Sequence, residues 1–145
     1  MLDFGIGIEI DAPPDLVWSV MRDIDRWPEW TPTVTSIRKL GKGPLVVGSR
    51  LVIKQPKLPP SVWKLTVMDD KARSFDWTTG FPGMLLTASH RVEPTDGRSR
   101  AHLSIRFSGV FGPLFARLTK GINDGYLALE ANGLKERSES LRLQS

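Results

Sequence analysis

The chain has 145 residues, a size typical of one domain and large enough to bury a full hydrophobic core without disulfides or metals. It contains no cysteine, which excludes disulfides, thiolate metal sites and cysteine nucleophiles and fits a reducing compartment. The formal net charge of +4 comes from basic residues scattered among acidic ones, unlike the clustered charge of a nucleic-acid-binding surface. The sequence has no signal-peptide pattern and no apolar run near the ~20 residues of a membrane span, so we expect a cytoplasmic protein.

In chain order, the first elements predicted are a strand and two helical segments. Residues 4–10 alternate, with the even positions apolar, which predicts a strand with one buried face. The segment 11–15 contains two prolines and is a typical helix start, and apolar residues follow it at helical spacing as far as Ile24. Prolines in 25–32 allow at most a short second helical turn there.

From residue 33 the pattern changes to short β segments. Turn signals such as 41–44 and 95–98 separate runs of β-branched and aromatic residues. The connections are too short for crossover helices, so we expect an antiparallel meander. The predicted strands lie near residues 33–40, 47–55, 61–69, 73–79, 84–93 and 99–108.

A long helix is predicted from Phe111 to about Glu136, followed by a polar tail at 138–145. Its start fits the pair Gly112-Pro113, because proline is tolerated at the first helical position. Gly125 and Gly133 lie on its apolar face, where they indicate either close approach of helix to sheet or space for a ligand. The apolar face consists of Phe111, Leu114, Phe115, Leu118, Ile122, Tyr126 and Leu129.

Several segments, spread over essentially the whole chain, resemble the START-like SRPBCC superfamily, in particular its bacterial polyketide cyclase/dehydrase-type branch. They are residues 8–18, 23–30, 48–51, 92–94, 97–100 and 107–109. The resemblance implies one α+β domain over residues 1–145 with the helix-grip fold: a curved seven-stranded antiparallel sheet wrapped around a long C-terminal helix, with two short helices after the first strand. It also implies a cavity between sheet and helix that takes apolar or amphipathic small molecules.

One end of the meander is predicted to open into this cavity. Successive hairpins alternate between the two ends of a sheet, so the loops at 55–60, 80–84 and 109–113 should share an end. They are rich in proline and glycine and carry exposed apolar residues, which either form a portal or plug the end of the core. The predicted portal residues are Leu58, Phe81, Val110 and Phe111.

Strand parity predicts which side chains face the cavity. Inward-pointing residues should be the odd-numbered ones on the strands from 51 to 79, Val67 included, and on the strand from 103 to 107. On the strand from 84 to 92 the even-numbered residues should point inward. The helix adds further candidates. The predicted ligand-binding residues are Ile53, Trp63, Trp77, Thr79, Met84, Leu86, His90, Phe107, Leu118, Ile122 and Gly125.

His90 is the one titratable group that parity directs inward. It is a candidate to hydrogen-bond a ligand or to act as acid/base, or else a core histidine bonded to a neighbouring strand. The sequence has no metal-binding motif and no serine on a strand-turn-helix elbow, so we expect neither metal nor cofactor.

Three functions remain open at this point. The first is binding or transport of a hydrophobic, lipid-like or polyketide-like molecule, with His90 and Thr79 orienting it. The second is a cyclase or dehydratase that uses His90 as acid/base. The third is a protein-interaction module that docks through the apolar loops. The expected partner is a hydrophobic small molecule rather than nucleic acid, and the chain is expected to be a monomer or a homodimer.

Overall fold

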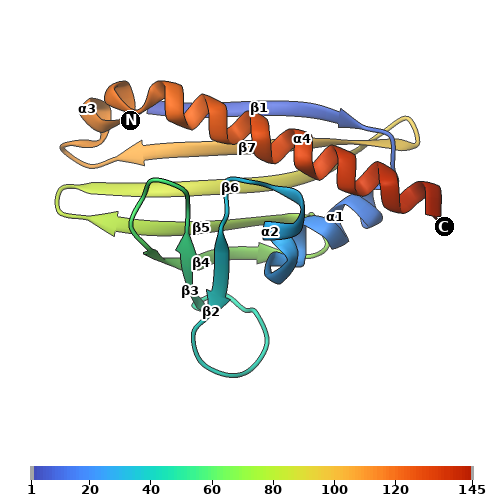
Figure 1. Cartoon of the computed structure of the whole chain (residues 1–145), viewed down its shortest axis with the longest axis horizontal. Coiled ribbons are helices and arrows are strands. Elements are labelled where there is room, and N and C mark those ends of the chain that lie inside the picture. The colour runs from blue at the N-terminus through green and yellow to red at the C-terminus, as the bar shows by residue number, and fades with distance from the viewer. Residues whose placement is uncertain (1, 145) are drawn as a thin grey trace.

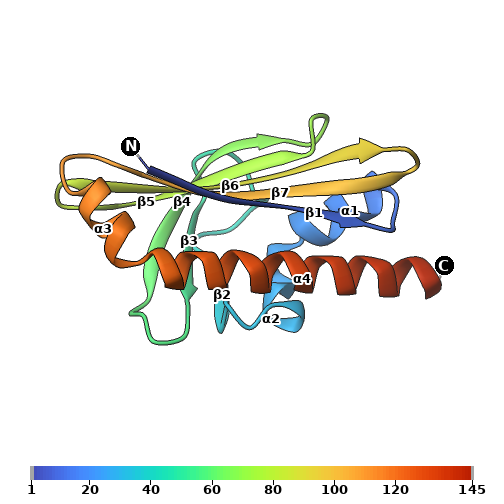
Figure 2. The same ribbon diagram turned by 90° about the horizontal axis from the view of Figure 1, so that it is seen from above.

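A curved antiparallel sheet carries all the helices on one face (Figures 1 and 2). The computed structural model describes residues 2–144. The strands are β1 (Leu2–Ile10), β2 (Ser36–Lys39), β3 (Arg50–Lys54), β4 (Ser61–Asp69), β5 (Ser74–Phe81), β6 (Met84–Thr95) and β7 (Arg98–Ser108). The helices are α1 (Pro14–Arg22), the 3-10 turn η1 (Ile24–Arg26), α2 (Trp27–Trp30), α3 (Gly112–Leu118) and α4 (Lys120–Gln144).

The sheet is the predicted meander, with the first strand added beside the last. Its order is β1-β7-β6-β5-β4-β3-β2, and every neighbouring pair is antiparallel. The predicted helix-grip fold is confirmed, because this sheet curves around α4 and two short helices follow β1 (Figure 2). None of the helices between residues 2 and 144 is both long and apolar enough to cross a membrane.

The predicted C-terminal helix differs from the structure in its length and continuity. It consists of α3 and α4, which are separated at Thr119. The hydroxyl of Thr119 donates to the carbonyl oxygen of Phe115 at 2.7 Å, a local bond typical of a helix end. The predicted polar tail is helical as far as Gln144, and Ser138 within it is fully buried.

The buried face of this helical region is not the one that the apolar residues predict. Small or short side chains, together with two leucines, face the sheet and the N-terminal helices, and at Gly133 α4 approaches α2 too closely for any side chain. The predicted apolar face is instead largely exposed, with Leu118 at 71% and Ile122 at 52% of full exposure. The buried positions are Gly112, Ala116, Asn123, Leu127, Ala131, Gly133, Leu134 and Ser138.

Strand parity holds along most of the sheet and fails at one β-bulge. His90, Phe75, Trp77 and Leu65 are buried as predicted. The register shifts between Leu65 and Val67, and this extra residue turns Val67 to the outside, where it is 40% exposed.

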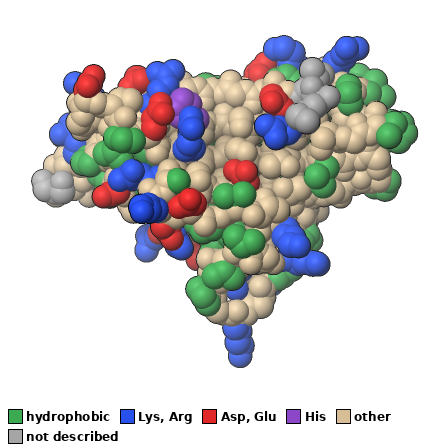
Figure 3. Space-filling view, turned by 180° about the vertical axis from the view of Figure 1, so that it is seen from behind, with side chains coloured by type: hydrophobic (Ala, Val, Ile, Leu, Met, Phe, Trp, Pro, Cys, Tyr) green, Lys and Arg blue, Asp and Glu red, His purple; other side chains and the backbone are tan. Residues whose placement is uncertain are grey.

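The outer face of the sheet carries charges of both signs (Figure 3). Arg100 pairs with Glu9 at 2.5 Å and Arg106 with Asp3 at 3.3 Å, across the β1–β7 ladder. Exposed pairs of this kind contribute little to stability. The candidate functional site lies between the opposite, inner face of the sheet and α4.

Candidate functional site

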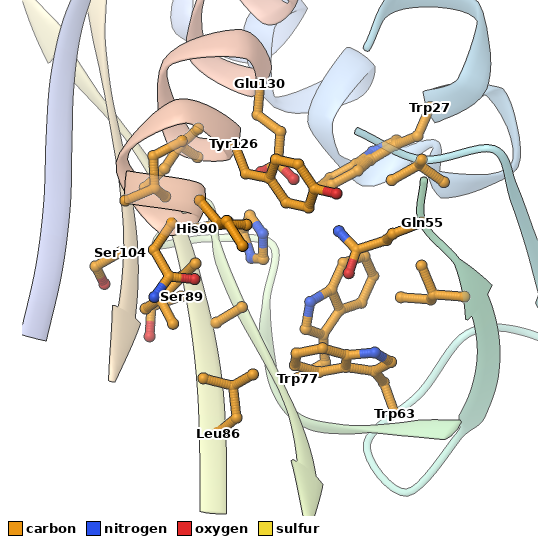
Figure 4. A pocket seen from close by; sticks show the side chains of 18 of the residues that line it. Trp27, Gln55, Trp63, Trp77, Leu86, Ser89, His90, Ser104, Tyr126 and Glu130 are labelled. Atoms are coloured by element: carbon orange, nitrogen blue, oxygen red, sulfur yellow. The ribbon is translucent and has the colours of Figure 1, made fainter. Parts of the chain in front are cut away.

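A cavity of about 110 Å³ lies between the inner face of the sheet and α4 (Figure 4). β3 to β7 supply its floor, α4 its roof, and the β3–β4 loop its edge. The predicted residues that line it are Ile53, Leu58, Trp63, Trp77, Leu86, His90 and Ile122. Most of the wall is apolar, as expected of a site for a largely apolar guest.

Aromatic rings packed against one another form the floor near α2. The rings of Trp27, Trp77 and His90 have centroids 5.2 to 5.4 Å apart. The imidazole of His90 stacks on Phe75 with centroids 4.2 Å apart and an angle of 12°. Such a packed cluster holds the histidine in one orientation.

The protonation state of His90 follows from its surroundings. Its Nδ1 lies 3.2 Å from the carbonyl oxygen of Phe75, which only accepts, so Nδ1 carries the hydrogen and Nε2 carries the lone pair. Burial lowers the pKa of His90 to about 4, against the opposing effect of this hydrogen bond. At neutral pH the ring is therefore an uncharged acceptor, and it has no proton on Nε2 to give to a ligand.

Glu130, on α4, is the acidic group of the cavity, and it is not among the residues predicted from the sequence. Its Oε1 accepts a hydrogen bond from the hydroxyl of Thr33 at 3.0 Å. Because that hydroxyl gives its hydrogen to Glu130, the neighbouring hydroxyl of Thr31 donates to Thr33 in turn, at 2.9 Å. The two buried threonines thus fix Oε1 as an acceptor, and any proton on the carboxyl sits on Oε2.

Burial raises the pKa of Glu130 to about 7, although the hydrogen bond from Thr33 acts in the opposite direction. No lysine, arginine or second carboxyl lines the cavity among the described residues, so no charge offsets the burial. A carboxyl that titrates near neutral pH in a cavity is typical of a functional group. Residues 2–144 contain no cluster of histidines and carboxyls that could hold a metal ion.

On the opposite side, one indole hydrogen has no acceptor. Nε1 of Trp63 is buried and has no hydrogen-bond partner within residues 2–144. An unsatisfied buried donor costs about 1–3 kcal/mol.

The mouth of the cavity lies between the β3–β4 loop and α4. The hydroxyl of Tyr126 donates to the carbonyl oxygen of Pro56 at 2.8 Å and so fastens the loop to the helix. Lys54 Nζ donates to the carbonyl oxygens of Gln55 and Leu58 and fixes the shape of the loop. The β3–β4 loop is therefore a lid held by one side-chain hydrogen bond to α4.

Tyr126→Phe is expected to release this lid. The loss of one hydrogen bond should weaken closure by about 1 kcal/mol, which corresponds to roughly fivefold more frequent opening. Hydrogen exchange of the backbone amides of Gln55, Lys57, Leu58 and Ser61 measures the effect. Ser61→Ala is the control, because its hydroxyl makes only a 3.5 Å contact within the loop. Equal exchange in both variants would contradict the role of Tyr126.

The other predicted portal residues lie away from the cavity, at the end where the β5–β6 turn meets α3 (Figure 1). The ring of Phe111 packs on Gly83, and its backbone N–H bonds to the carbonyl of Gly83 at 2.9 Å. Phe81 and Val110 are exposed there without lining the cavity. Of the predicted portal residues only Leu58 lines the cavity, so the three loops do not form one portal.

Five predicted ligand-binding residues also lie outside the cavity. Thr79 is buried and donates to the carbonyl of Val62 at 2.8 Å, and Phe107 packs edge-on against Phe4. Met84 sits at the β5–β6 turn. Leu118 and Gly125 are exposed, and a Cβ at Gly125 would meet nothing within 4 Å.

The missed residues of the cavity are polar, and they come from α4 and the lid. They are Gln55, Asn123, Tyr126 and Glu130. Positions 123, 126 and 130 share one helical face, so their spacing was a usable signal once the cavity side of α4 was known. Tyr126 was predicted on the apolar face but not among the ligand-binding residues, and the polarity of the others did not single them out.

Comparison with known proteins agrees with this architecture. A family model described as polyketide cyclase/dehydrase and lipid transport matches residues 1–139. The chain belongs to this family. No curated protein is similar enough in sequence to count as a relative. The polyketide cyclase/dehydrase and lipid transport family includes the branch that the sequence segments resemble.

Solved structures related to this family member share its fold. A solution structure from Thermobifida fusca is 27% identical, with a TM-score of 0.79 over 97% of this chain and 95% of that one. Zhui aromatase/cyclase from Streptomyces sp. R1128 is 19% identical, with a TM-score of 0.73 over 95% and 93%. Norcoclaurine synthase from Thalictrum flavum is 18% identical, with a TM-score of 0.75 over 99% and 96%.

Proposed function

We propose that the protein binds a small, mostly apolar molecule, about the size of one substituted ring, in the cavity under α4. The main observation that supports this proposal is a cavity of about 110 Å³ with mostly apolar walls and a few polar side chains held in place by hydrogen bonds. Cavities for drug-sized ligands are about 300–1,000 Å³, whereas an apolar cavity of about 150 Å³ accepts benzene. The hollow is smaller than either, so one substituted ring fits only with small shifts of the lining side chains, and a multi-ring or long-chain guest requires the lid to move.

Apolar burial gives such a guest moderate affinity. Burying roughly 200 Å² at roughly 25 cal/mol per Å² contributes about 5 kcal/mol, which alone corresponds to a Kd of a few tenths of a millimolar. Polar contacts in the cavity have to add to this for tight binding. The membership of the chain in a family described by lipid transport supports a binding role.

Filling the cavity tests the proposal. Leu86→Trp places a larger side chain in the hollow, and binding of toluene or benzyl alcohol should weaken more than tenfold. Trp27, Trp63 and Trp77 line the site, so intrinsic fluorescence reports occupancy. Leu85→Trp is the matched control, since Leu85 is exposed on the same strand. Unchanged binding to Leu86→Trp would overturn the proposal.

A second candidate function is a cyclase or dehydratase, favoured by Glu130 rather than by His90. A carboxyl with a pKa near 7 is suited to general acid/base catalysis at neutral pH. The uncharged His90 serves better to orient a substrate than to protonate it. Conversion of a bound guest, followed by mass spectrometry, separates this function from simple binding.

A further inference from the structure

The polar side chains that line the cavity from α4 share one property: each is held by a hydrogen bond to a neighbour and leaves an acceptor position unbonded within the described chain. Asn123 illustrates it. The hydroxyl of Thr119 gives its hydrogen to Phe115, so it accepts from Nδ2 of Asn123, at 2.9 Å. This fixes the orientation of the amide and leaves Oδ1 as an acceptor.

Tyr126 and His90 follow the same pattern. Tyr126 donates its hydroxyl hydrogen to the carbonyl of Pro56, which can only accept, so the lone pairs of its oxygen remain. His90 donates from Nδ1 to the carbonyl of Phe75 and keeps a lone pair on Nε2. Neither acceptor atom makes a hydrogen bond to another described residue.

Glu130 completes the set. Thr33 occupies Oε1, and Oε2 makes no hydrogen bond within the described chain. Asn123, Tyr126 and Glu130 lie on one face of α4, at a spacing of three and four residues, and His90 faces them from β6 (Figure 4). The cavity therefore has an acceptor-rich roof with one ionisable carboxyl and, among the described lining residues, no basic side chain.

We propose that the ligand is a compact organic cation, a primary amine on a small apolar body, whose ammonium group pairs with Glu130. This rests on the proposed function, because it names the chemical class of the same guest. An ammonium group has three N–H donors, which match the acceptors of α4 and β6. Burying a cation is costly unless it is paired, and Glu130 supplies the opposite charge.

The remaining walls suit the body of such a ligand. The aromatic rings of Trp27, Trp77 and Tyr126 line the cavity, and aromatic surfaces attract organic cations. Of the two buried indole donors without an acceptor among residues 2–144, Trp30 and Trp63, only Trp63 lines the cavity, and Figure 4 places it away from Glu130. The indole N–H of Trp63 therefore does not face the position of the ammonium group.

Binding should depend on pH through Glu130. Two other titratable groups face Glu130: His90 from β6, which is uncharged above pH 5, and Tyr126 from α4 itself. The neighbours from α2 and from the segment before β2 are uncharged; they are Trp27, Thr33 and Val34. The amine binds the ionised carboxylate, so its affinity should rise about tenfold between pH 6 and pH 8.

Calorimetric titration with benzylamine and benzyl alcohol, two probes of nearly equal shape, tests the proposal. At pH 8 we expect benzylamine to bind the full chain about tenfold more tightly than benzyl alcohol, and this preference to disappear at pH 6. Glu130→Gln should lose the preference at both pH values. Glu136→Gln, an exposed carboxyl on the same helix, should keep it.

The outcomes separate two kinds of failure. If benzyl alcohol binds at least as tightly as benzylamine at pH 8, the cation proposal is wrong and the binding function stands. If neither probe binds at either pH, the proposed function fails together with this inference. The pH comparison uses the unmodified protein, so it decides the question even where the Glu130→Gln chain does not fold.

Discussion

Gly133→Ala is expected to destabilise the protein by about 3 kcal/mol, because the added methyl group has no space. A Cβ at this position would lie 2.0 Å from the carbonyl oxygen of Trp30 and 3.1 Å from its carbonyl carbon and ring. The obstacle is backbone rather than a flexible side chain, so α2 or α4 has to shift. Urea unfolding followed by circular dichroism measures the effect.

Gly125→Ala is the matched control on the same helix. No atom lies within 4 Å of a Cβ there, and α4 is regular at this point. The substitution should stabilise the protein by about 0.5–1 kcal/mol through helix propensity alone. If the two alanines have the same effect, the close approach of α2 and α4 at Gly133 is not a constraint on the fold.

These two glycines also decide between the two interpretations that the sequence left open. Gly133 marks a close approach, although the partner is α2 rather than the sheet. Gly125 also leaves space, but that space lies on the solvent side of α4 and not in the cavity. Two glycines on the same predicted helix face therefore have different causes: Gly133 is required by a close contact with α2, and Gly125 has no contact that requires glycine. The sequence of the helix alone does not distinguish the two cases.

The sheet could be predicted from the sequence because its determinants are local. Tight turns between short alternating segments leave only hairpin connections, and period-2 alternation assigns each residue to a face. The burial of His90 followed from this. Val67 was assigned wrongly because a bulge depends on how two strands pair, and nothing in the strand itself marks the inserted residue.

The helical face could not be predicted in the same way, because it depends on what the helix approaches. The apolar spacing from Leu114 to Leu129 indicates an amphipathic helix, yet α4 buries a different set of positions, among them Ala131 and Ser138. With the face misassigned, nothing singled out Glu130 as a cavity residue. Its role in the cavity became visible only with the positions of Thr33 and His90.

The largest pH-dependent effect on stability is expected for Glu130→Gln. The pKa of Glu130 is about 7 in the folded chain and near 4.5 in an unfolded one. Below pH 4.5 both states carry the proton, so the carboxyl does not affect stability. As the pH rises from 4.5 to 7, the unfolded state loses its proton first, and the folded protein is destabilised by about 1.4 kcal/mol per pH unit.

Above pH 7 the full penalty applies, about 3 kcal/mol. Glutamine has the same shape and keeps the acceptor for Thr33, but it does not titrate. Glu130→Gln should therefore match the original chain at pH 4 and be more stable by up to about 3 kcal/mol at pH 8. His90 titrates with the opposite sign, losing stability as the pH falls below 6.5, and it cancels because both chains contain it.

Urea unfolding at pH 4, 6 and 8 measures this difference, with Glu136→Gln as the control. Glu136 is exposed, so its replacement should change stability by less than about 0.5 kcal/mol at every pH. A pH-independent gain for Glu130→Gln would show that its carboxyl is solvated in the folded protein. That result would also remove the physical basis for pairing Glu130 with a buried ligand cation.

A gain at high pH would carry a functional meaning as well. A ligand that binds the ionised carboxylate should then stabilise the original chain more than the glutamine variant, and more at pH 8 than at pH 6. The same side chain would thus weaken the empty protein and strengthen the occupied one. This opposition of stability and binding is expected of a group placed for function rather than for folding.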